Sequence, residues 1–373
     1  MTSGKKILLV QLYSNGDCLY ATAVARQIKY DYPGCHLTWA IAGFCKSIIA
    51  SNPYVDEIME VNTVPQKDAG AFRKFKKDIL RRKSTGQFEE IFITQIIDTN
   101  QALYDGTIRS TIFRAYSNPI TVPVQPVVRL SDFEISNAQK FSVQNNLPSY
   151  KHVVLFEFAP LSGQSKLTKE MAISIAENLT GDKEVAVILS SGNKIDHTHK
   201  NIIDGSNLTL RETAALTHYC TLLVGCSSGI TWISTSEAAK PLPMIQILNP
   251  FTTFINPVSR DFKRLGFDTS RVIEITMSEK DAITSCVKQS LNDFPLAKKL
   301  FNQQIPLHFT TTRLIIYNLL CYLEFGAILK HIKINREVFG NNFSFYKEVV
   351  VGFLIAPFTL LKNKIKKNIL EKR

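Results

Sequence analysis

Cysteine occurs seven times in the 373 residues, but in no arrangement that binds a metal ion or builds a disulfide framework. The number is odd, the positions are scattered, and no CxxC pair occurs. This pattern argues against a zinc knuckle and a secreted disulfide-bonded domain, and it predicts a reducing, cytoplasmic compartment. The seven histidines are equally dispersed, so we expect no metal site and no cofactor.

Long hydrophobic runs are also absent. Residues 349–361 form an apolar stretch of 13 residues that contains Pro357, whereas a helix that spans a bilayer needs about 20. Near the N-terminus, the apolar segment 7–10 is too short for a secretory leader. We therefore expect neither a membrane span nor a leader peptide.

Two common nucleotide-binding motifs are missing, since the sequence has no GxGxxG fingerprint and no GxxxxGK[ST] loop. It does have a net charge of +12. Residues 305–373 hold 11 Lys and Arg against four acidic residues, and residues 67–83 hold eight against two. Such stretches attract nucleic acid, an anionic membrane or a phosphorylated substrate. Because no stacking aromatics are interleaved with the charges, we expect no nucleic acid partner.

The C-terminal stretch combines apolar segments with a lysine-rich end, which is typical of a segment that lies on an anionic leaflet. Its part 314–323 is equally consistent with a buried helix. The basic stretch 67–83 has apolar residues at helical spacing, and the alternative to a binding role is a solvated charged face.

The order of predicted elements indicates an α/β protein with two domains, as the length also favours. Short apolar strands alternate with helices, and the alternation restarts after a proline-bearing connection. Strands are predicted at 7–11, 36–41, 57–61, 90–94, 153–158, 184–189, 221–225 and 244–248, and helices at 18–31, 44–51, 69–83, 168–180, 210–219 and 228–239. The expected domains are an N-terminal domain at 1–130, a linker at 131–150, a C-terminal domain at 151–300 and a basic helical tail at 301–373.

Repeated βαβ units form parallel sheets, whose ligands bind beyond the carboxyl ends of the strands. Two such domains predict a cleft lined by the loops that follow the strands. The first of these loops contains Gly16 and Asp17, next to a helix start. Asp17 is either an N-cap or a general base that faces the cleft, and the helix N-terminus should keep its carboxylate ionised.

Two further loops follow strands of the second domain. Residues 225–232 form a Gly/Ser turn before a helix, and residues 162–166 place Lys166 in a flexible loop. Free backbone N–H groups and a lysine suit a diphosphate, although ordinary βα turns and surface lysines look the same. All three loops should meet at one cleft.

At these loops the chain resembles glycosyltransferase family 9, the group of ADP-heptose:lipopolysaccharide heptosyltransferases. The resemblance covers most of residues 5–250 and is strongest over the first strand, the Gly16–Asp17 loop and the segment NPYVDEI at 52–58. In the second half, residues 208–241 resemble the donor-binding stretch of the family.

The resemblance implies a GT-B-like architecture, with two Rossmann-like domains whose parallel sheets face each other across a cleft. It also implies inverting transfer without a metal ion, with the acceptor on the first domain and the nucleotide sugar on the second. Carried over, Asp17 is the general base. The donor-binding residues are Ser165, Lys166, Asp196, Ser227, Ser228, Gly229, Ile230 and Thr231, and the acceptor-binding residues are Asn15, Gly16, Lys74 and Lys77.

The sequence departs from the family at specific positions. The family usually has an aspartate at the position of Ser227 and a histidine at that of Trp232, and a tryptophan is common at that of Thr168. Asp196 is a loose counterpart of the acidic residue that contacts the ribose, and Asn193 competes for that role. A catalytically degenerate binding or scaffold protein with the GT-B fold is therefore the alternative.

The leading expectation is an inverting glycosyltransferase that moves a sugar from a nucleotide-diphosphate donor to a lipopolysaccharide or other surface-glycan acceptor. Its partners would be the donor, an anionic glycolipid or glycan, and an anionic membrane surface through the tail. It would be cytoplasmic and peripheral on the inner face of the inner membrane. Another GT-B enzyme, such as a sugar-phosphate epimerase or a transferase with a different nucleotide, is the second enzyme class.

Overall fold

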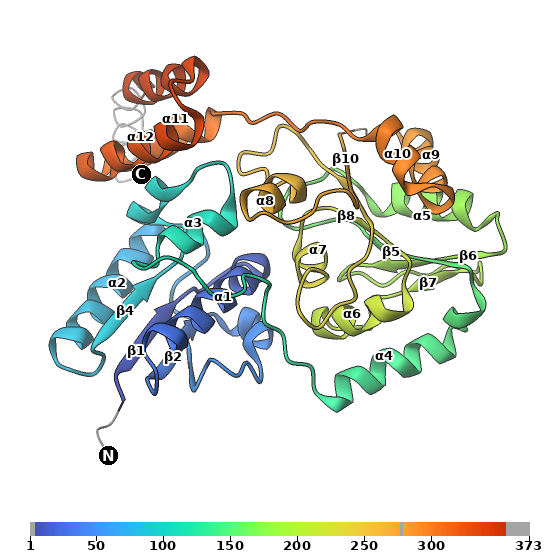
Figure 1. Cartoon of the computed structure of the whole chain (residues 1–373), viewed down its shortest axis with the longest axis horizontal. Helices are drawn as coiled ribbons and strands as arrows, with labels where there is room; N and C mark the ends of the chain where they lie inside the picture. The colour runs from blue at the N-terminus through green and yellow to red at the C-terminus, as the bar shows by residue number, and fades with distance from the viewer. Residues whose placement is uncertain (1–3, 277–278, 356–373) are drawn as a thin grey trace, which may run out of the picture.

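The computed structural model describes residues 4–276 and 279–355. It contains two lobes, each built on a parallel sheet with helices packed on it, and C-terminal helices that lie against the N-terminal lobe (Figure 1). The helix α4 (Asp132–Gln144) lies in the connection between the lobes. This confirms the predicted α/β class with two Rossmann-like domains and a helical C-terminal extension.

The N-terminal lobe has four parallel strands in the order β3-β2-β1-β4. In β1 (Lys6–Val10), the four apolar residues are fully buried and alternate between two hydrophobic clusters, one on each face of the sheet. A continuous apolar run therefore forms a central strand that is covered on both faces. The other strands are β2 (His36–Ile41), β3 (Glu57–Glu60) and β4 (Glu90–Ile93).

Three helices of this lobe were predicted, one of which differs in type, whereas η2 (Asp98–Leu103) and α3 (Ile108–Arg114) were not predicted. The segment predicted as a helix at 44–51 is a 3₁₀ helix, η1, and the predicted helix at 69–83 begins where the Asp68 side chain accepts a hydrogen bond from Ala71 N at 2.9 Å. The helices are α1 (Asn15–Asp31), η1 (Gly43–Ile49), α2 (Ala69–Ser84), η2 (Asp98–Leu103) and α3 (Ile108–Arg114).

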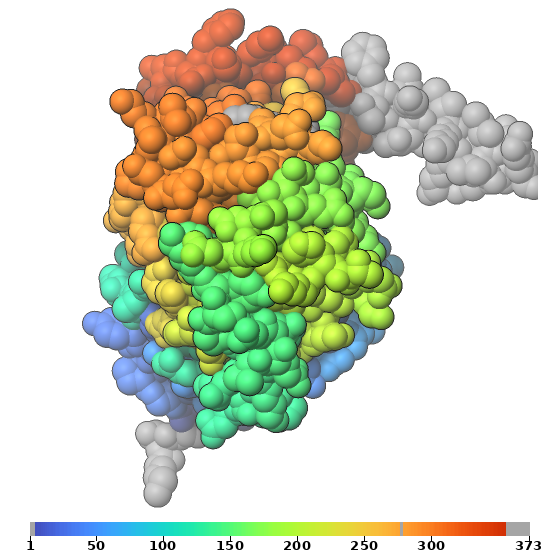
Figure 2. Space-filling view, turned by 90° about the vertical axis from the view of Figure 1, so that its right-hand side faces the viewer, coloured from blue at the N-terminus to red at the C-terminus, as the bar shows by residue number. Residues whose placement is uncertain are grey.

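The C-terminal lobe has six parallel strands in the order β10-β9-β8-β5-β6-β7. Four of them were predicted, whereas β7 and β10 were not. Figure 2 views the molecule from the side of this lobe. The strands are β5 (His152–Glu157), β6 (Val185–Ser190), β7 (Ile202–Asp204), β8 (Leu222–Gly225), β9 (Met244–Ile247) and β10 (Val272–Ile275).

The predicted helix at 228–239 is wrong in length, because α7 ends at Ile233. Beyond it, the hydroxyls of Ser234 and Thr235 donate to helix carbonyls, which competes with continuation of the helix. The helices between the linker and the C-terminal group are η3 (Leu147–Ser149), α5 (Lys169–Thr180), α6 (Leu210–Leu216), η4 (Thr217–Tyr219), α7 (Gly229–Ile233), α8 (Val258–Arg264), α9 (Lys280–Asn292) and α10 (Phe294–Phe301).

The C-terminal helices α11 (Thr310–Cys321) and α12 (Phe325–Phe339), with a further helix at 343–355, pack on the N-terminal lobe. Ile315, Ile316 and Leu319 of α11 share a hydrophobic cluster with Ala102 and Tyr104. The predicted buried helix at 314–323 therefore overlaps α11, but its last two residues lie beyond the helix end and are exposed. No helix of residues 4–276 and 279–355 has both the length and the apolar character to cross a membrane.

The two lobes are in direct contact through a hydrophobic cluster to which both contribute. The ring of Tyr20 in α1 meets that of Trp232 in α7 edge-on, with centroids 5.0 Å apart. Close by, Arg109 of α3 pairs with Asp261 of α8 at 3.0 Å, and both side chains are at most 1% exposed. The interface thus combines apolar packing with a buried ion pair.

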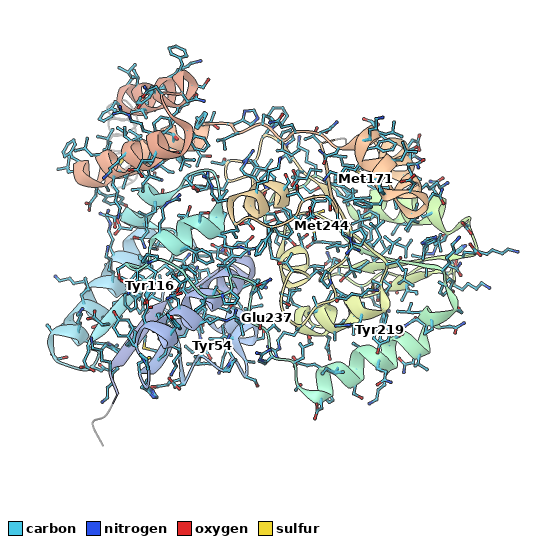
Figure 3. The ribbon with its side chains drawn as sticks, viewed as in Figure 1. Tyr54, Tyr116, Met171, Tyr219, Glu237 and Met244 are labelled. Carbon is cyan, nitrogen blue, oxygen red and sulfur yellow. The ribbon has the colours of Figure 1, made fainter. Side chains whose placement is uncertain are left out.

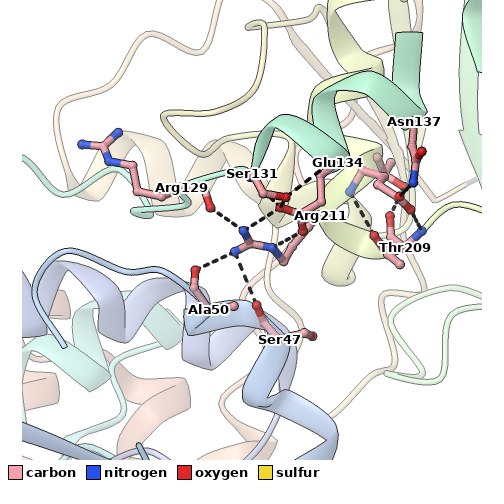
Figure 4. A network of polar contacts seen from close by, with 10 residues as sticks. Ser47, Ala50, Arg129, Ser131, Glu134, Asn137, Thr209 and Arg211 are labelled. Atoms are coloured by element: carbon pink, nitrogen blue, oxygen red, sulfur yellow. Dashed lines mark hydrogen bonds and ion pairs between the residues drawn. The ribbon is translucent and has the colours of Figure 1, made fainter. Parts of the chain in front are cut away.

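Polar contacts hold the lobes together at a second place. Arg211 of α6, a buried residue, donates to the carbonyl oxygens of Ser47 and Ala50 in the other lobe and pairs with Glu134 of α4 (Figure 4). Glu237, labelled near the boundary between the lobes in Figure 3, pairs with Arg26 of α1. The relative position of the lobes is therefore fixed by several independent contacts.

Candidate functional site

The loop after β1 is held by buried amide side chains from a neighbouring strand end. The Gln95 side-chain oxygen accepts hydrogen bonds from Leu12 N at 2.8 Å and from Tyr13 N at 2.9 Å. The Tyr13 hydroxyl donates to Val64 O at 2.5 Å, which ties this loop to the segment after β3. Gln95 was not among the predicted site residues, because a glutamine after a short strand gives no distinctive signal.

Asp17 lies in the first turn of α1, and Ser14 is the N-cap residue, with a φ of 67°. The N-cap interpretation of Asp17 is therefore wrong. Among the described residues, no hydrogen bond or ion pair is made by the Asp17 carboxyl. Packing of protein around it raises its pKa to about 7. The expectation that the helix N-terminus keeps it ionised at neutral pH is also wrong, because burial raises its pKa to that range.

The Gly16–Asp17 loop meets the second predicted loop, which lies in the other lobe. A Cβ atom at Gly16 would lie 3.3 Å from Trp232 Cδ1, and one at Gly229 would lie 3.7 Å from Asn15 Cβ. The Asn15 side-chain oxygen is buried and has no hydrogen-bond partner among the described residues. The structure therefore brings Asn15, Gly16 and Gly229 together.

The loop between β8 and α7 is organised around a carboxylate that sequence analysis missed. Glu157, at the end of β5 and 1% exposed, accepts hydrogen bonds from Cys226 N and Thr231 Oγ1, each at 2.8 Å, and from Ser228 Oγ. The hydroxyls of Ser228 and Thr231 are thus engaged within the protein. A single acidic residue inside an otherwise apolar strand was the available signal.

Ser227 has a strained backbone and a fixed side chain. Its φ is 51°, its N–H donates to Gln246 Oε1 at 2.8 Å, and its hydroxyl donates to Asn256 O at 2.5 Å. Residues 225–229 match the GxSxG spacing of a nucleophile elbow, a match that sequence analysis overlooked. Because the Ser227 hydroxyl faces a carbonyl oxygen and no histidine, the geometry does not support an activated serine nucleophile.

The loop at 162–166 reaches the same region. The Gln164 side-chain oxygen accepts a hydrogen bond from Asn256 N at 3.1 Å, and Asn256 O accepts one from the Ser227 hydroxyl, which joins this loop to the one between β8 and α7. Lys166 is exposed and makes no ion pair or hydrogen bond with the described residues. Ile230 is partly buried against the cluster that both lobes share. Residues of three predicted loops therefore gather at the interface between the lobes.

Asp196 lies apart from this group. Its side chain is 82% exposed and pairs with Lys194 at 3.0 Å. It lines an open hollow of about 470 Å³ with Ile195, His197 and Thr198. Among the described residues, no contact joins it to Asp17 or to the loop at 227–231.

Most of the basic side chains of the stretch 67–83 are neutralised within the protein. Arg73 and Lys76 pair with Asp98, Arg81 and Arg82 pair with Asp78, and Lys83 pairs with Glu90.

Two of the predicted acceptor-binding residues, Lys74 and Lys77, are exposed and have no partner among the described residues. Lys74 lines a hollow of about 780 Å³ between α2 and the segment after β3. That segment also holds Val64, which receives the hydroxyl of Tyr13. The hollow and the Gly16–Asp17 loop thus belong to the same lobe, and the hydrogen bond between Tyr13 and Val64 connects the segments that form them.

Residues that could hold a metal ion are not gathered anywhere in the described ranges 4–276 and 279–355. No group of three or more His, Cys, Asp or Glu side chains has suitable proximity there.

Comparisons with known proteins identify solved structures with a similar fold. No protein-family model matches the sequence, and no curated protein matches it. A glycosyl transferase of family 9 from Veillonella parvula is 14% identical with a TM-score of 0.52, covering 76% of this chain and 91% of its own. The ADP-heptose lipopolysaccharide heptosyltransferase II of E. coli is 15% identical with a TM-score of 0.52, covering 79% of this chain and 99% of its own. The chain thus shares the fold of glycosyltransferase family 9 structures, as the resemblance predicted.

Proposed function

We propose that the protein is an inverting glycosyltransferase that needs no metal ion and moves a sugar, such as heptose, from a nucleotide-diphosphate sugar to a lipopolysaccharide or other surface-glycan acceptor. The observation that carries this proposal is the carboxyl of Asp17, which has no partner among the described residues, a pKa raised to about 7 and a place where the lobes meet. The names of the two similar structures support the same class of reaction.

Asp17 acts as the general base. In inverting transfer, the acceptor oxygen attacks the anomeric carbon and its proton passes to the base. The bond from that carbon to the diphosphate oxygen breaks, and the electron pair leaves with the nucleoside diphosphate. A carboxyl with a pKa near 7 is ionised in about half of the molecules at neutral pH and accepts a proton readily. A positioned base contributes about 10²- to 10⁴-fold to the rate.

The C-terminal lobe binds the donor. Lys166 and Ser165 contact the diphosphate, where a cation and hydrogen-bond donors stabilise the charge that develops on the leaving group. The backbone of residues 227–231 approaches the phosphates, whereas Asp196, which lies apart from these loops and pairs with Lys194, is not part of this donor site. The hydrogen bonds through Asn256, which join Gln164 to Ser227, support a shared role for the two loops.

The N-terminal lobe binds the acceptor. Asn15 and Gly16 contact the acceptor beside the base, and Lys74 and Lys77 attract its anionic groups. The unpaired side chains of both lysines support this assignment, since their neighbours on α2 are neutralised within the protein. Such an acceptor is lipid-linked, so the enzyme works as a cytoplasmic protein peripheral to the inner face of the inner membrane.

A second candidate is a catalytically degenerate binding or scaffold protein with the same fold. Two contacts favour it. Glu157 already occupies the hydroxyls of Ser228 and Thr231, and Trp232 packs against Gly16 at the junction of the lobes. A protein of this kind would bind a glycan or a nucleotide without turnover.

The test is the Asp17→Asn variant, assayed for release of nucleoside diphosphate from ADP-heptose, UDP-glucose and GDP-mannose with a lipopolysaccharide core oligosaccharide as acceptor. Assays in EDTA test metal independence, and NMR of the product tests inversion. The matched control is Asp132→Asn, because Asp132 is exposed in the first turn of α4 and far from the site in sequence.

We expect turnover by the wild-type protein and by Asp132→Asn, and a loss of about 10²-fold or more in Asp17→Asn. Transfer at the wild-type rate by folded Asp17→Asn would remove the base assignment. Binding of a donor without turnover by the wild-type protein would establish the scaffold alternative.

A further inference from the structure

Exposed apolar side chains are concentrated on the C-terminal helices. Of the 20 large apolar side chains that are exposed in the described residues, ten lie between residues 314 and 355. Single exposed apolar residues are normal on a protein surface, whereas a concentration of them indicates a contact surface. This segment therefore has a function besides its packing on the N-terminal lobe.

The clearest group lies where α11 turns into α12, and we call it the corner patch: Tyr322, Leu323, Phe325 and Leu329. Leu323 is 73% exposed, Phe325 56% and Leu329 68%. Phe325 and Leu329 are four residues apart on α12 and so lie on one face, whereas Ile328 and His331 of the same helix are buried. The patch faces outward because the opposite face of α12 packs on the lobe.

Positive charge surrounds the corner patch. Lys333 and Arg336 continue the outward face of α12 one and two turns beyond Leu329, and both are exposed. Two acids lie nearby: Glu337, 4.0 Å from Lys333, and Glu324, which lies between Leu323 and Phe325 and pairs with Arg73 at 3.8 Å. The surface therefore combines apolar side chains with basic ones.

The corner patch also adjoins the basic helix α2. The Arg73 guanidinium lies over the Tyr322 ring, 3.3 Å from its centroid. Lys77 is one helical turn beyond Arg73, so it lies on the same side of α2, and it has no partner among the described residues. An exposed lysine thus lies on the side of α2 that carries Arg73, the residue in contact with Tyr322.

We propose that the corner patch docks the protein on an anionic lipid bilayer. Tyr322, Leu323, Phe325 and Leu329 enter the headgroup region, and Lys77, Lys333 and Arg336 contact lipid phosphates. A second copy of the chain fits less well, because two such basic surfaces repel each other. Docking itself does not depend on the proposed function. Only its purpose does, which is to bring the lobe that carries Asp17 close to a lipid-linked acceptor.

The test is flotation of the full chain with vesicles of phosphatidylcholine alone and of phosphatidylcholine with 30% phosphatidylglycerol. The variant Leu323→Glu/Leu329→Glu changes the patch. The control is Phe133→Glu/Val143→Glu on α4, where the two side chains are each 70% exposed. Thermal denaturation and gel filtration accompany each protein, so that misfolding and self-association are detected.

We expect wild-type protein and the α4 control to bind the anionic vesicles at least tenfold more tightly than the neutral ones, and to lose binding in 0.5 M NaCl. The patch variant should bind at least tenfold more weakly while it remains folded. Equal binding by wild-type protein and the patch variant would overturn the proposal. So would a wild-type dimer that the patch variant dissociates, without any vesicle binding. Since no donor is present, these results are independent of sugar transfer, and Asp17→Asn should bind vesicles normally.

Discussion

The buried ion pair between Arg109 and Asp261 should make an unusually large contribution to stability when one partner alone is removed. Arg109 is 1% exposed, and its guanidinium lies 4.5 Å from the centroid of the Tyr20 ring and 5.7 Å from that of Trp232. Burial raises the pKa of Asp261 to about 6, so at pH 7 the carboxylate is mostly ionised and balances the arginine. Asp261→Asn keeps the shape and leaves the arginine charge uncompensated.

Removal of one partner of a buried pair costs about 3–5 kcal/mol. For a chain of 373 residues, the unfolding entropy is about 0.8 kcal/mol/K, so Tm should fall by about 4–6 °C. The measurement is thermal denaturation at pH 7 by circular dichroism, with Asp132→Asn as the exposed control.

The double variant Arg109→Met/Asp261→Leu tests whether the uncompensated charge lowers the Tm, because it removes both charges and keeps a similar volume. Replacement of a buried pair by apolar residues is often neutral or stabilising, so the double variant should recover most of the lost Tm. A double variant no more stable than Asp261→Asn, or an Asp261→Asn variant with the Tm of the control, would refute the account.

Three further predictions concern single carboxyls. The pKa of Asp17 in the folded protein is about 7, above its usual 3.8, so its contribution to stability is present below pH 4 and is lost as the pH rises through 7. The Asp17→Asn variant should therefore gain stability relative to wild type between pH 5 and pH 8. The gain, measured by chemical denaturation, should reach as much as about 4 kcal/mol. The pKa of Glu134 is lowered to about 2, mainly by Arg211. Its contribution to the free energy of unfolding, about 3 kcal/mol, is therefore present above pH 4.5 and is lost as the pH falls through 2. The Glu134→Gln variant should lack that part of the acid dependence of stability. The Glu157→Gln variant replaces a carboxylate that accepts three hydrogen bonds by an amide that carries its own N–H donors. It should therefore lower stability by about 1–3 kcal/mol and raise the KM for the nucleotide sugar. Unchanged stability and KM would contradict the role of Glu157 in shaping the loop.

The parts of the fold that the sequence predicts well are those with strong local signals. The run of apolar residues in β1 and the helical periodicity of α2 depend on neighbours in sequence, and both elements lie where the patterns indicate. The helix after β8 is different. Its predicted length of 228–239 follows from apolar spacing, whereas the hydroxyls of Ser234 and Thr235 bond to helix carbonyls, and that competition depends on side-chain conformation.

The candidate site was predictable in its location but not in its electrostatics. Loops after parallel strands meet because of topology, which is why Gly16 and Gly229 lie near the same interface. The pKa of Asp17 depends on its burial in the folded protein, and the role of Glu157 depends on a strand that is distant in sequence from the loop it holds. The charge state of the basic helix α2 was not predictable either, since Asp98 and Glu90, which are distant in sequence, neutralise some of its basic side chains.

The pH dependence of kcat/KM for sugar transfer tests the assignment of Asp17 as the base most directly. The account predicts an ascending limb with an apparent pKa of about 7 in the wild-type protein, and a residual rate without that limb in Asp17→Asn. A limb centred near pH 4, or the same profile in both proteins, would contradict it.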